Sequence, residues 1–491
     1  MYLILRKAAT FHILWTSNKH LGCGGKTLNN QLFQSESIHF NADSFFYSFK
    51  EQTSKVDHAI YLESGRSGKQ HIAAWNPLAV IQSMDEGIQI QWRNGDVEIR
   101  KGESLELIEQ LTNTYAFQTE EELFTGGVIG SISYDYARKI ESLSNTAADD
   151  LHFPDQFMYL VDAWAVFDVE KSELTVMKTS TSDVNLADWF KQWESAEAKR
   201  IFSKDAKVLN HQIENMNVSM NGAQFEAAVR QIQEYIKQGD VFQVNLSVRQ
   251  SKDFTVEPII LFEALRTFNP SPYSALIKSP AFSIVSGSPE LLIKKDDEDL
   301  STRPIAGTRP RGNNDAEDLE LANELINNEK ERAEHVMLVD LERNDLGKVS
   351  AYGTVHVDEF MVIEKYSHVQ HIVSNVRSKI AANQSNTEVI RAMFPGGTIT
   401  GAPKIRTMEI IEELEPVRRG IYTGSIGWIG YNGDLDMNIV IRTAFIQDEK
   451  VYIQAGAGIV IDSIPEKEYI ESLNKAKAMW QAVQMVEEVQ Q

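Results

Sequence analysis

The chain has 491 residues, of which 42% are hydrophobic and 24% charged, a composition that excludes collagen-like, coiled-coil and largely disordered proteins. Its 48 Lys and Arg residues face 70 Asp and Glu residues, which gives a formal net charge of −22. This charge disfavours nucleic acid and anionic membranes as partners. An anionic substrate would therefore need a local cation or a bound metal ion to hold it.

Cys23 is the only cysteine, so an intramolecular disulfide is impossible and a cytoplasmic location is expected. No apolar run reaches the roughly 20 residues that cross a bilayer. No acidic residue precedes Glu36, and this contrast with the acidic remainder predicts an atypical extension over residues 1–40. We expect a first region over 41–180, a polar connection over 181–221 and a second region over 222–485.

Alternating apolar and polar residues with Gly and Asn turns predict mostly strands from Ile60 to about Val176. Ile88–Trp92, before the Asn94-Gly95 turn, and Thr125–Tyr134 are examples. The connection contains one expected helix, around Trp189–Ile201.

The second region alternates helices and strands. Helices are predicted at Gly222–Lys237, Pro258–Phe268 and Asp315–Leu341 and from Pro403, and strands at Phe242–Arg249, Tyr273–Lys278, Ser283–Lys295, Asn438–Thr443 and Val451–Ile461. Asn432-Gly433 is a type I′ hairpin signal between two strands. The last helix should begin near Pro465, because Ser463 and Glu466 have capping-box spacing.

Helical spacing also predicts which residues of two helices face the core. For the helix from Asp315 these are Leu325, Ile326, Ala333, Met337 and Leu341, and for the helix from Pro403 they are Ile405, Met408, Ile411 and Leu414.

Two pairs of glutamates are each spaced one helical turn apart, Glu331 with Glu334 and Glu468 with Glu471. The ordinary interpretation of such a pair is a solvated acidic face, because like charges at this spacing repel. The alternative is a Mg²⁺ site, since this ion prefers carboxylate oxygens and keeps positions open for an anionic substrate.

Glycine-rich segments could bring backbone N–H groups close to an anion. Gly396 to Lys404 leads into a helix N-terminus, and Gly456 to Gly458 lies within a predicted strand. Tight turns and close strand packing are the alternative for either segment.

Three further side chains could take part in chemistry. Arg442 on an apolar strand needs a carboxylate, from the protein or from a ligand. Glu290 could be a general acid if burial raises its pKa, or a turn residue. His371 could be catalytic, or a hydrogen-bonded core histidine.

Six segments in order resemble the chorismate-utilising enzyme family, which includes anthranilate synthase component I, aminodeoxychorismate synthase component I and the isochorismate and salicylate synthases. They are QVNLS (243–247), GSPE (287–290), RPIAGTRPRG (303–312), ERAEHVMLVDLERNDLG (331–347), FPGGTITGAPK (394–404) and AGAGIVIDSIPEKEY (455–469). YLESGRSG (61–68) and GGVIGSISYDYAR (126–138) resemble the family more thinly.

The resemblance implies an α/β fold of the α+β type, with two packed antiparallel sheets and helices outside. It makes 41–180 an anthranilate synthase component I-like region and 222–485 the chorismate-binding catalytic region. It also implies a Mg²⁺ site that grips the ring carboxylate of chorismate, formed by Glu331, Glu334, Glu468 and Glu471.

The resemblance further implies the roles of individual residues around the substrate. Arg442 and Tyr422 would bind the enolpyruvyl carboxylate, and other substrate contacts would come from Gly307, Thr308, Thr400, Gly456, Ala457, Gly458 and Lys475. Glu290 and His371 would manage the proton transfers as the C4 hydroxyl departs. Gln243 stands where the water-using relatives carry a lysine base, so the expected nucleophile is an amine.

Two aminations of chorismate are then possible. QVNLS, FPGGTITGAPK and GSIGWIGY (424–431) resemble the enzymes that place ammonia at C4 and keep the enolpyruvyl group, which is the favoured reaction, with 4-aminobenzoate and folate synthesis as its setting. Many of these enzymes carry a nucleophilic lysine where this chain has Ala306. Alanine at that position is typical of anthranilate synthases, so formation of anthranilate and pyruvate is the alternative. An inactive tryptophan-binding or scaffold subunit is a third.

Two partners are expected. The ammonia would come from glutamine through a separate amidotransferase subunit, because Cys23 lacks the surroundings of a glutaminase nucleophile. Tryptophan is a possible ligand, since Glu63 and Ser64 with Pro272 and Tyr273 resemble a tryptophan pocket of relatives.

Overall fold

The computed structural model describes residues 33–64, 69–117, 123–195, 200–202, 216–366 and 369–490. Cys23 and the rest of the predicted extension up to residue 32 lie outside these ranges. So do residues 65–68 of the YLESGRSG segment and much of the predicted connection, namely 196–199 and 203–215.

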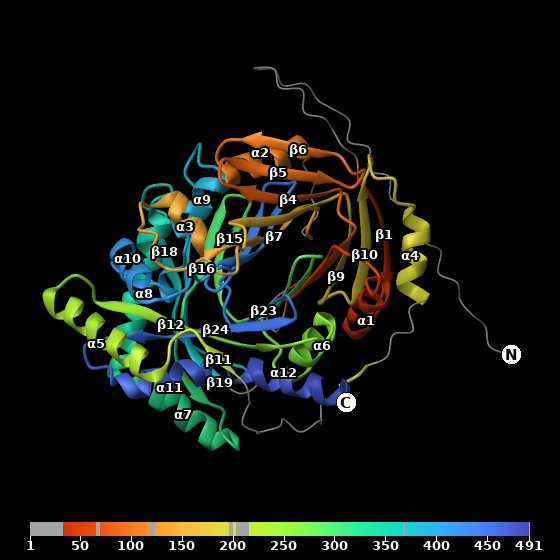
Figure 1. The fold of residues 1–491 in the computed structure, drawn as a ribbon. Coiled ribbons are helices and arrows are strands. Elements are labelled where there is room, and N and C mark those ends of the chain that lie inside the picture. Colours follow the sequence, from red (N-terminus) through yellow and green to blue (C-terminus); the bar gives the residue numbers. More distant parts are fainter. Residues whose placement is uncertain are drawn as a thin grey trace.

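Two large antiparallel sheets form the centre of the molecule (Figure 1). The first has twelve strands in the order β1 (Phe33–His39), β10 (Glu173–Thr179), β9 (Ala163–Asp168), β3 (Gln70–Trp75), β2 (Ala59–Ser64), β13 (Tyr273–Lys278), β14 (Ser283–Ser288), β23 (Thr443–Gln447), β24 (Lys450–Ile459), β12 (Gln243–Asp253) and β11 (Asn217–Val218), with β20 (Gly401–Ala402) paired to β12.

The second sheet also has twelve strands. Their order is β17 (Ile305–Pro310), β19 (Val369–Lys379), β16 (Asp299–Arg303), β15 (Leu291–Asp296), β22 (Leu435–Asn438), β21 (Ser425–Gly430), β7 (Gly127–Ile132), β8 (Gln156–Val161), β4 (Ala79–Met84), β5 (Gly87–Trp92) and β6 (Val97–Lys101), with β18 (His356–Lys365) paired to β19.

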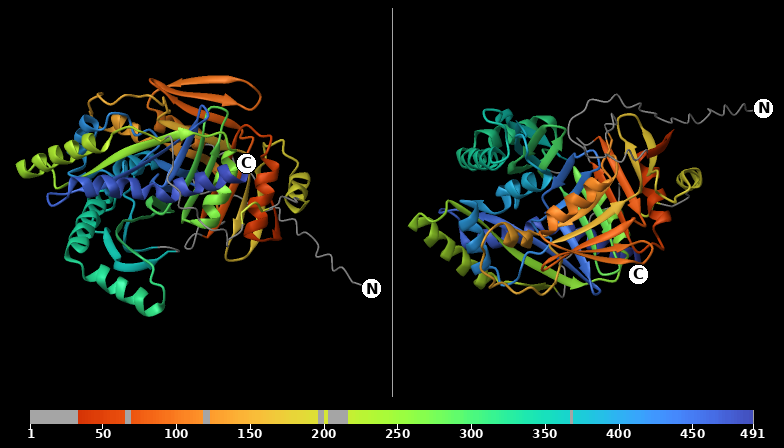
Figure 2. Two further views of the ribbon diagram at one scale, coloured as in Figure 1. Left: turned by 60° about the horizontal axis from the view of Figure 1, so that its bottom comes forward. Right: turned by 90° about the horizontal axis from the view of Figure 1, so that it is seen from above.

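Helices surround the sheets, and Figure 2 shows them on the outside in two further views. They are α1 (Ala42–Gln52), α2 (Ser104–Thr114), α3 (Ala137–Ile140), α4 (Leu186–Ser195), α5 (Gly222–Gln238), α6 (Pro258–Phe268), α7 (Asp315–Asn327), α8 (Glu329–Gly347), α9 (Asn386–Met393), α10 (Lys404–Leu414), α11 (Pro465–Lys475) and α12 (Lys477–Gln490). None of those in the described ranges is long and apolar enough to cross a membrane.

The two halves of the chain share both sheets. In the first sheet β2 pairs with β13, and in the second β7 pairs with β21. Buried side chains from both sheets, such as Ile60 and Ile284 from one and Ile129 and Ile426 from the other, form a common core cluster. Two packed antiparallel sheets with helices outside, as the family resemblance implied, are confirmed.

One helix prediction is wrong in extent, and another falls partly on residues outside the described ranges. The helix expected over Asp315–Leu341 is two helices, because Asn328 has extended backbone and its side chain caps α8 by accepting from the N–H of Glu331. The break changes which face is buried, so Ala333 is exposed and Glu342 is buried. The helix expected around Trp189–Ile201 is present as α4 over Leu186–Ser195, and residues 196–199 lie outside the described residues.

Three local predictions near the site also need correction. Ile405, expected in the core, is 48% exposed. Ile464 rather than Ser463 occupies the N-cap of α11, and no side chain of the described residues caps that helix. Arg442 lies in no strand: the chain crosses there from β22 in one sheet to β23 in the other, and Arg442 has a φ of +52°.

Candidate active site

The side chains of Gln243 and Asn245 each lie over a glycine of the neighbouring strand. In the β12–β24 pairing Asn245 is opposite Gly458 and Ser247 is opposite Gly456. A Cβ atom on Gly458 would be 2.3 Å from Nε2 of Gln243, and one on Gly456 would be 2.6 Å from Oδ1 of Asn245. The two positions need glycine because these amide side chains occupy the space above them.

Gln243 connects this strand pair to the first pair of glutamates. Its Nε2 donates a hydrogen bond to Oε1 of Glu334 over 3.2 Å. Its Oε1 and the Oδ1 of Asn245 are buried and accept no hydrogen bond from the described residues. Unpartnered buried acceptors are rare in folded proteins, so a ligand that donates hydrogen bonds would satisfy this wall of the site.

Glu331 and Glu334 project from the first turns of α8. Glu331 forms an ion pair with Arg309, with 3.1 Å between Oε1 and Nη1. Glu334 has no ion pair among the described residues, and burial together with the nearby charge of Glu331 raises its pKa. The inner member of the pair is therefore a carboxylate that lacks a cation.

Glu468 and Glu471 repeat this arrangement on α11. Glu471 pairs with Lys475, with 3.0 Å between Oε1 and Nζ. Burial and the charge of Glu471 raise the pKa of Glu468, while Lys330 and Lys475 lower it. The same two lysines lower the pKa of Glu334, which places both glutamate pairs around a shared set of charges.

Carboxylate oxygens are the ligands that Mg²⁺ prefers. Two of the four glutamates, Glu334 and Glu468, form no ion pair in the described ranges. The chemistry of this donor set therefore fits Mg²⁺. Within those ranges no three His, Cys, Asp or Glu side chains are grouped closely enough to hold a metal ion.

His371 is held in one tautomer by strand β17. Its Nδ1 lies 2.9 Å from the carbonyl oxygen of Gly307 and 3.0 Å from Oγ1 of Thr308. A carbonyl only accepts, so Nδ1 carries the proton. Nε2 is buried without a partner among the described residues, and burial lowers the pKa of His371 to about 4. The imidazole therefore presents an unprotonated nitrogen.

Glu290 and Arg442 lie near each other where the chain passes between the sheets. Burial raises the pKa of Glu290 to about 7, and the nearby charge of Arg442 opposes that rise. Oε1 of Glu290 is buried and unpartnered in the described ranges. Burial lowers the pKa of Arg442, which forms no ion pair with any described residue. A ligand carboxylate would satisfy this guanidinium.

Thr400 and Tyr422 are held by their own turns. Oγ1 of Thr400 donates to the carbonyl oxygen of Gly396 over 3.0 Å, and the N–H of Asn245 donates to the carbonyl oxygen of Thr400 over 2.8 Å. Tyr422 is buried, and burial raises its pKa. Sequence reasoning missed Asn245, whose signal was its position two residues after Gln243 on the same strand face.

The residues expected to form a tryptophan pocket lie on adjacent strands. Tyr273 of β13 is opposite Ser64 of β2, and Pro272 directly precedes β13. Glu63 accepts hydrogen bonds from Arg266 over 2.8 and 3.1 Å. The structure therefore brings these four residues together.

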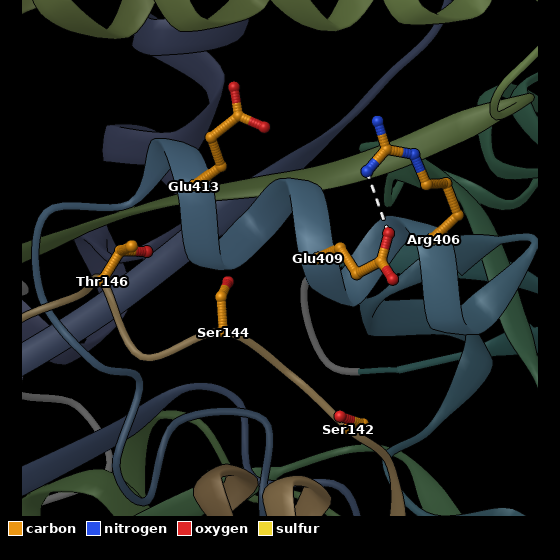
Figure 3. A pocket seen from close by; sticks show the side chains of 6 residues that line it. All are labelled: Ser142, Ser144, Thr146, Arg406, Glu409 and Glu413. Carbon is orange, nitrogen blue, oxygen red and sulfur yellow. Dashed lines mark hydrogen bonds and ion pairs between the residues drawn. The ribbon is translucent and has the colours of Figure 1, made fainter.

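A surface cavity of about 330 Å³ lies apart from all these residues (Figure 3). It is lined by Ser142, Ser144, Thr146, Arg406, Glu409 and Glu413. Arg406 is already paired with Glu409 and Asp240, so the cavity has no free cation for an anionic substrate. The convergence of unpartnered polar groups locates the candidate active site better than cavity size does.

A family model described as chorismate binding enzyme matches residues 57–481. Aminodeoxychorismate synthase component 1 of Bacillus subtilis (strain 168) is 48% identical over 461 residues, which cover 92% of this chain and 97% of that protein. Anthranilate synthase component 1 of Aquifex aeolicus (strain VF5) is 41% identical over 376 residues, covering 75% and 76%.

Solved structures show the same fold. Anthranilate synthase component I from Streptococcus pneumoniae TIGR4 superposes with a TM-score of 0.74 at 32% identity, covering 85% of this chain and 93% of that one. The isochorismate synthase MenF from Escherichia coli has a TM-score of 0.67 at 18% identity, covering 92% and 95%.

Proposed function

This chain belongs to the chorismate binding enzyme family, and on that premise we propose that it aminates chorismate to 4-amino-4-deoxychorismate. The observation that carries the proposal is the position of Gln243, whose amide lies beside Glu334 where water-using relatives place a lysine base. An amide does not deprotonate water, and its free oxygen suits an N–H donor such as ammonia. The extended similarity to aminodeoxychorismate synthase component 1 supports the same reaction.

The two carboxylates of chorismate would be held at opposite ends of the site. Arg442 and Tyr422 would bind the enolpyruvyl carboxylate, because Arg442 is a partly buried cation that forms no ion pair with a described residue. The backbone of Gly456, Ala457 and Gly458 would lie against the ring carboxylate. Further contacts at this end would come from Thr400, Gly307, Thr308 and Lys475.

Glu331, Glu334, Glu468 and Glu471 would hold Mg²⁺. When bound, the ion would offset the charge of the ring carboxylate in an acidic protein. Lys475 and Arg309, which pair with the outer glutamates, keep these side chains in place.

Glu290 is the proton donor in this proposal. A pKa of about 7 leaves a large fraction of the carboxyl protonated at neutral pH, so it can give its proton to the C4 oxygen as the carbon–oxygen bond breaks and water leaves. His371 is neutral and accepts through Nε2, so it orients a substrate hydroxyl or takes up a proton released by the incoming ammonia.

Ala306 favours a second candidate. It lies on β17 next to the Gly307 bulge and opposite Ile372, and it offers no amine that could attack C2. Ammonia itself would have to act there, as it does in forming anthranilate and pyruvate. Anthranilate synthesis therefore remains the alternative function, and the identity of the product decides between the two.

The nitrogen would reach this chain from a separate glutamine amidotransferase subunit, since Cys23 is the only cysteine available as a glutaminase nucleophile. The purified chain should use ammonium but not glutamine, and efficient glutamine-dependent turnover by the chain alone would refute the heterocomplex. A single cysteine also agrees with a reducing cytoplasm as its location.

Tryptophan would bind between β2 and β13, at Glu63, Ser64, Pro272 and Tyr273. Isothermal titration calorimetry tests this directly. A saturable heat at millimolar tryptophan is expected, and its absence together with an unchanged melting temperature would remove the pocket from the account.

The proposed reaction is tested by incubating the purified chain with chorismate, Mg²⁺ and ammonium and separating the products. Chorismate should be consumed, without release of pyruvate. Pyruvate release in equal amount to chorismate consumed would replace the proposal by the alternative.

A further inference from the structure

A buried ion pair lies directly behind the candidate substrate-binding residues. Arg419 is 3% exposed and Glu415 is 4% exposed. The guanidinium and the carboxylate meet in a two-bond fork, with Nε 3.0 Å from Oε2 and Nη2 2.8 Å from Oε1. Such a fork is the strongest geometry for this pair.

Arg419 uses its remaining donors on two backbone carbonyls and one side-chain hydroxyl around the site. Nη1 donates to the carbonyl oxygen of Ile399 over 3.0 Å and to Oγ1 of Thr423 over 3.3 Å. Nη2 donates to the carbonyl oxygen of Asn245 over 2.7 Å. All five N–H groups of the guanidinium are therefore occupied, which leaves none for a substrate.

Two aromatic rings also lie within reach of the guanidinium. Its central carbon is 4.9 Å from the ring centre of Tyr134 and 5.5 Å from that of Tyr422. Tyr134 belongs to the GGVIGSISYDYAR segment of the N-terminal half. That segment is tied to the same turn, because Tyr134 N–H donates to Gly420 O and Gly420 N–H donates to a carboxylate oxygen of Asp135.

Glu415 extends the connection along β12. Its Oε1 accepts from the N–H and the hydroxyl of Ser247 over 2.9 and 2.7 Å. Ser247 lies opposite Gly456. One ion pair thus contacts the turn before Thr400, the strand that carries Gln243, and the ring of Tyr422.

We propose that Arg419, with Glu415 as its counter-ion, is the positioning residue that sets the relative placement of Tyr422, Thr400 and β12 for binding chorismate. The proposal rests on the function proposed above, since those residues are assigned to chorismate there. Arg419 touches no substrate itself. A lysine at this position has three donors on a flexible stem and cannot reproduce five bonds in a fixed plane.

The test compares Arg419→Lys with Arg418→Lys. Arg418 is the adjacent residue, is partly exposed and pairs with Asp149 over 2.9 Å, so it is a matched control outside the site. Steady-state kinetics with chorismate, Mg²⁺ and ammonium should show a roughly 10- to 100-fold lower kcat/KM for Arg419→Lys, mostly through a raised KM for chorismate. Arg418→Lys should stay within about twofold.

A merely structural role would give a different result, because fewer folded molecules lower kcat and leave KM unchanged. The double variant Arg419→Lys/Tyr422→Phe adds a second readout. If Arg419 acts through Tyr422, the double variant loses less activity than the product of the two single losses. Additive losses with an unchanged KM would overturn the proposal.

Glu415→Gln decides the case if Arg419→Lys does not fold. It keeps the size of the side chain and one acceptor while it removes the fork, and the same rise in the KM for chorismate is expected. A wild-type chain that fails to consume chorismate would overturn both this inference and the proposed function. An active wild type with Arg419→Lys and Glu415→Gln indistinguishable from Arg418→Lys would overturn this inference alone.

Discussion

Replacing Glu290 with Gln should remove the proposed proton donor of the reaction and, at alkaline pH, make the fold more stable. In the wild type, burial raises the pKa of Glu290 from an ordinary value of about 4.5 to about 7. A raised carboxyl pKa means that the native state binds more protons than the unfolded state between these pH values, so stability falls as the pH rises through them. Below about pH 4.5 Glu290 is protonated in both states, so its burial no longer lowers the free energy of unfolding.

The size of the effect follows from the pKa difference. Each pKa unit corresponds to about 1.4 kcal/mol, so ionised Glu290 destabilises the native state by roughly 3 kcal/mol at pH 9. Glu290→Gln cannot ionise. Urea unfolding should show the variant to be more stable than the wild type by up to this amount at pH 9 and about equally stable at pH 4.5.

The activity of Glu290→Gln should fall although its stability rises. A general acid contributes typically 10²- to 10⁴-fold, so kcat/KM of Glu290→Gln should fall by at least ~100-fold. Wild-type kcat/KM should decline above about pH 7 as the carboxyl ionises, and this alkaline limb should disappear in the variant. Asp155→Asn is the control, because burial also raises the pKa of Asp155, a residue that is not assigned to substrate, metal or tryptophan. It should gain alkaline stability and keep its activity. A Glu290→Gln variant that retains kcat/KM within threefold would refute the reasoning.

His371→Asn should lower kcat/KM by ~100-fold or more. Because burial lowers the pKa of His371 to about 4, the pH profile of wild-type kcat/KM should show no acid limb near pH 6.5. An acid limb there that disappears in His371→Asn would count against a neutral imidazole. Glu334→Gln should raise the Mg²⁺ concentration for half-maximal activity by at least ~10-fold, and an unchanged Mg²⁺ dependence would withdraw Glu334 from the metal site. Gly458→Ala should reduce kcat at least ~10-fold, since its Cβ would lie 2.3 Å from Nε2 of Gln243. Gly347→Ala is the control: its Cβ would meet no atom of the described residues within 4 Å, so it should be neutral. Equal activities of the two variants would contradict the close approach at Gly458.

Local signals predicted individual elements well. Pro258–Phe268 begins with a proline, which suits the first turn of a helix, and the helix has the predicted bounds. Tyr273–Lys278 also matches its predicted strand. The pairing of β2 with β13 joins residues about 200 positions apart, and nothing within either strand encodes that partner. Only the family resemblance supplied the two-sheet arrangement.

Part of the candidate site could likewise be predicted from the sequence, and part depends on contacts between distant segments. Glycines 456 and 458 suggested close approach to some group, but only the register of β12 against β24 shows that Gln243 and Asn245 are the neighbours. Nothing in the sequence singles out Arg419 and Glu415, because burial of a charged pair depends on contacts from three distant segments. The break at Asn328 between α7 and α8 was invisible in a continuous helical pattern.

The identity of the product is the most direct test of the central claim that this chain places ammonia at C4 of chorismate. Purified chain would be incubated with chorismate, Mg²⁺ and ammonium at mildly alkaline pH, and the products separated with and without added aminodeoxychorismate lyase. The account predicts a product that becomes 4-aminobenzoate only when the lyase is present. Fluorescent anthranilate formed without the lyase would contradict it and show that Ala306 marks an anthranilate-forming site.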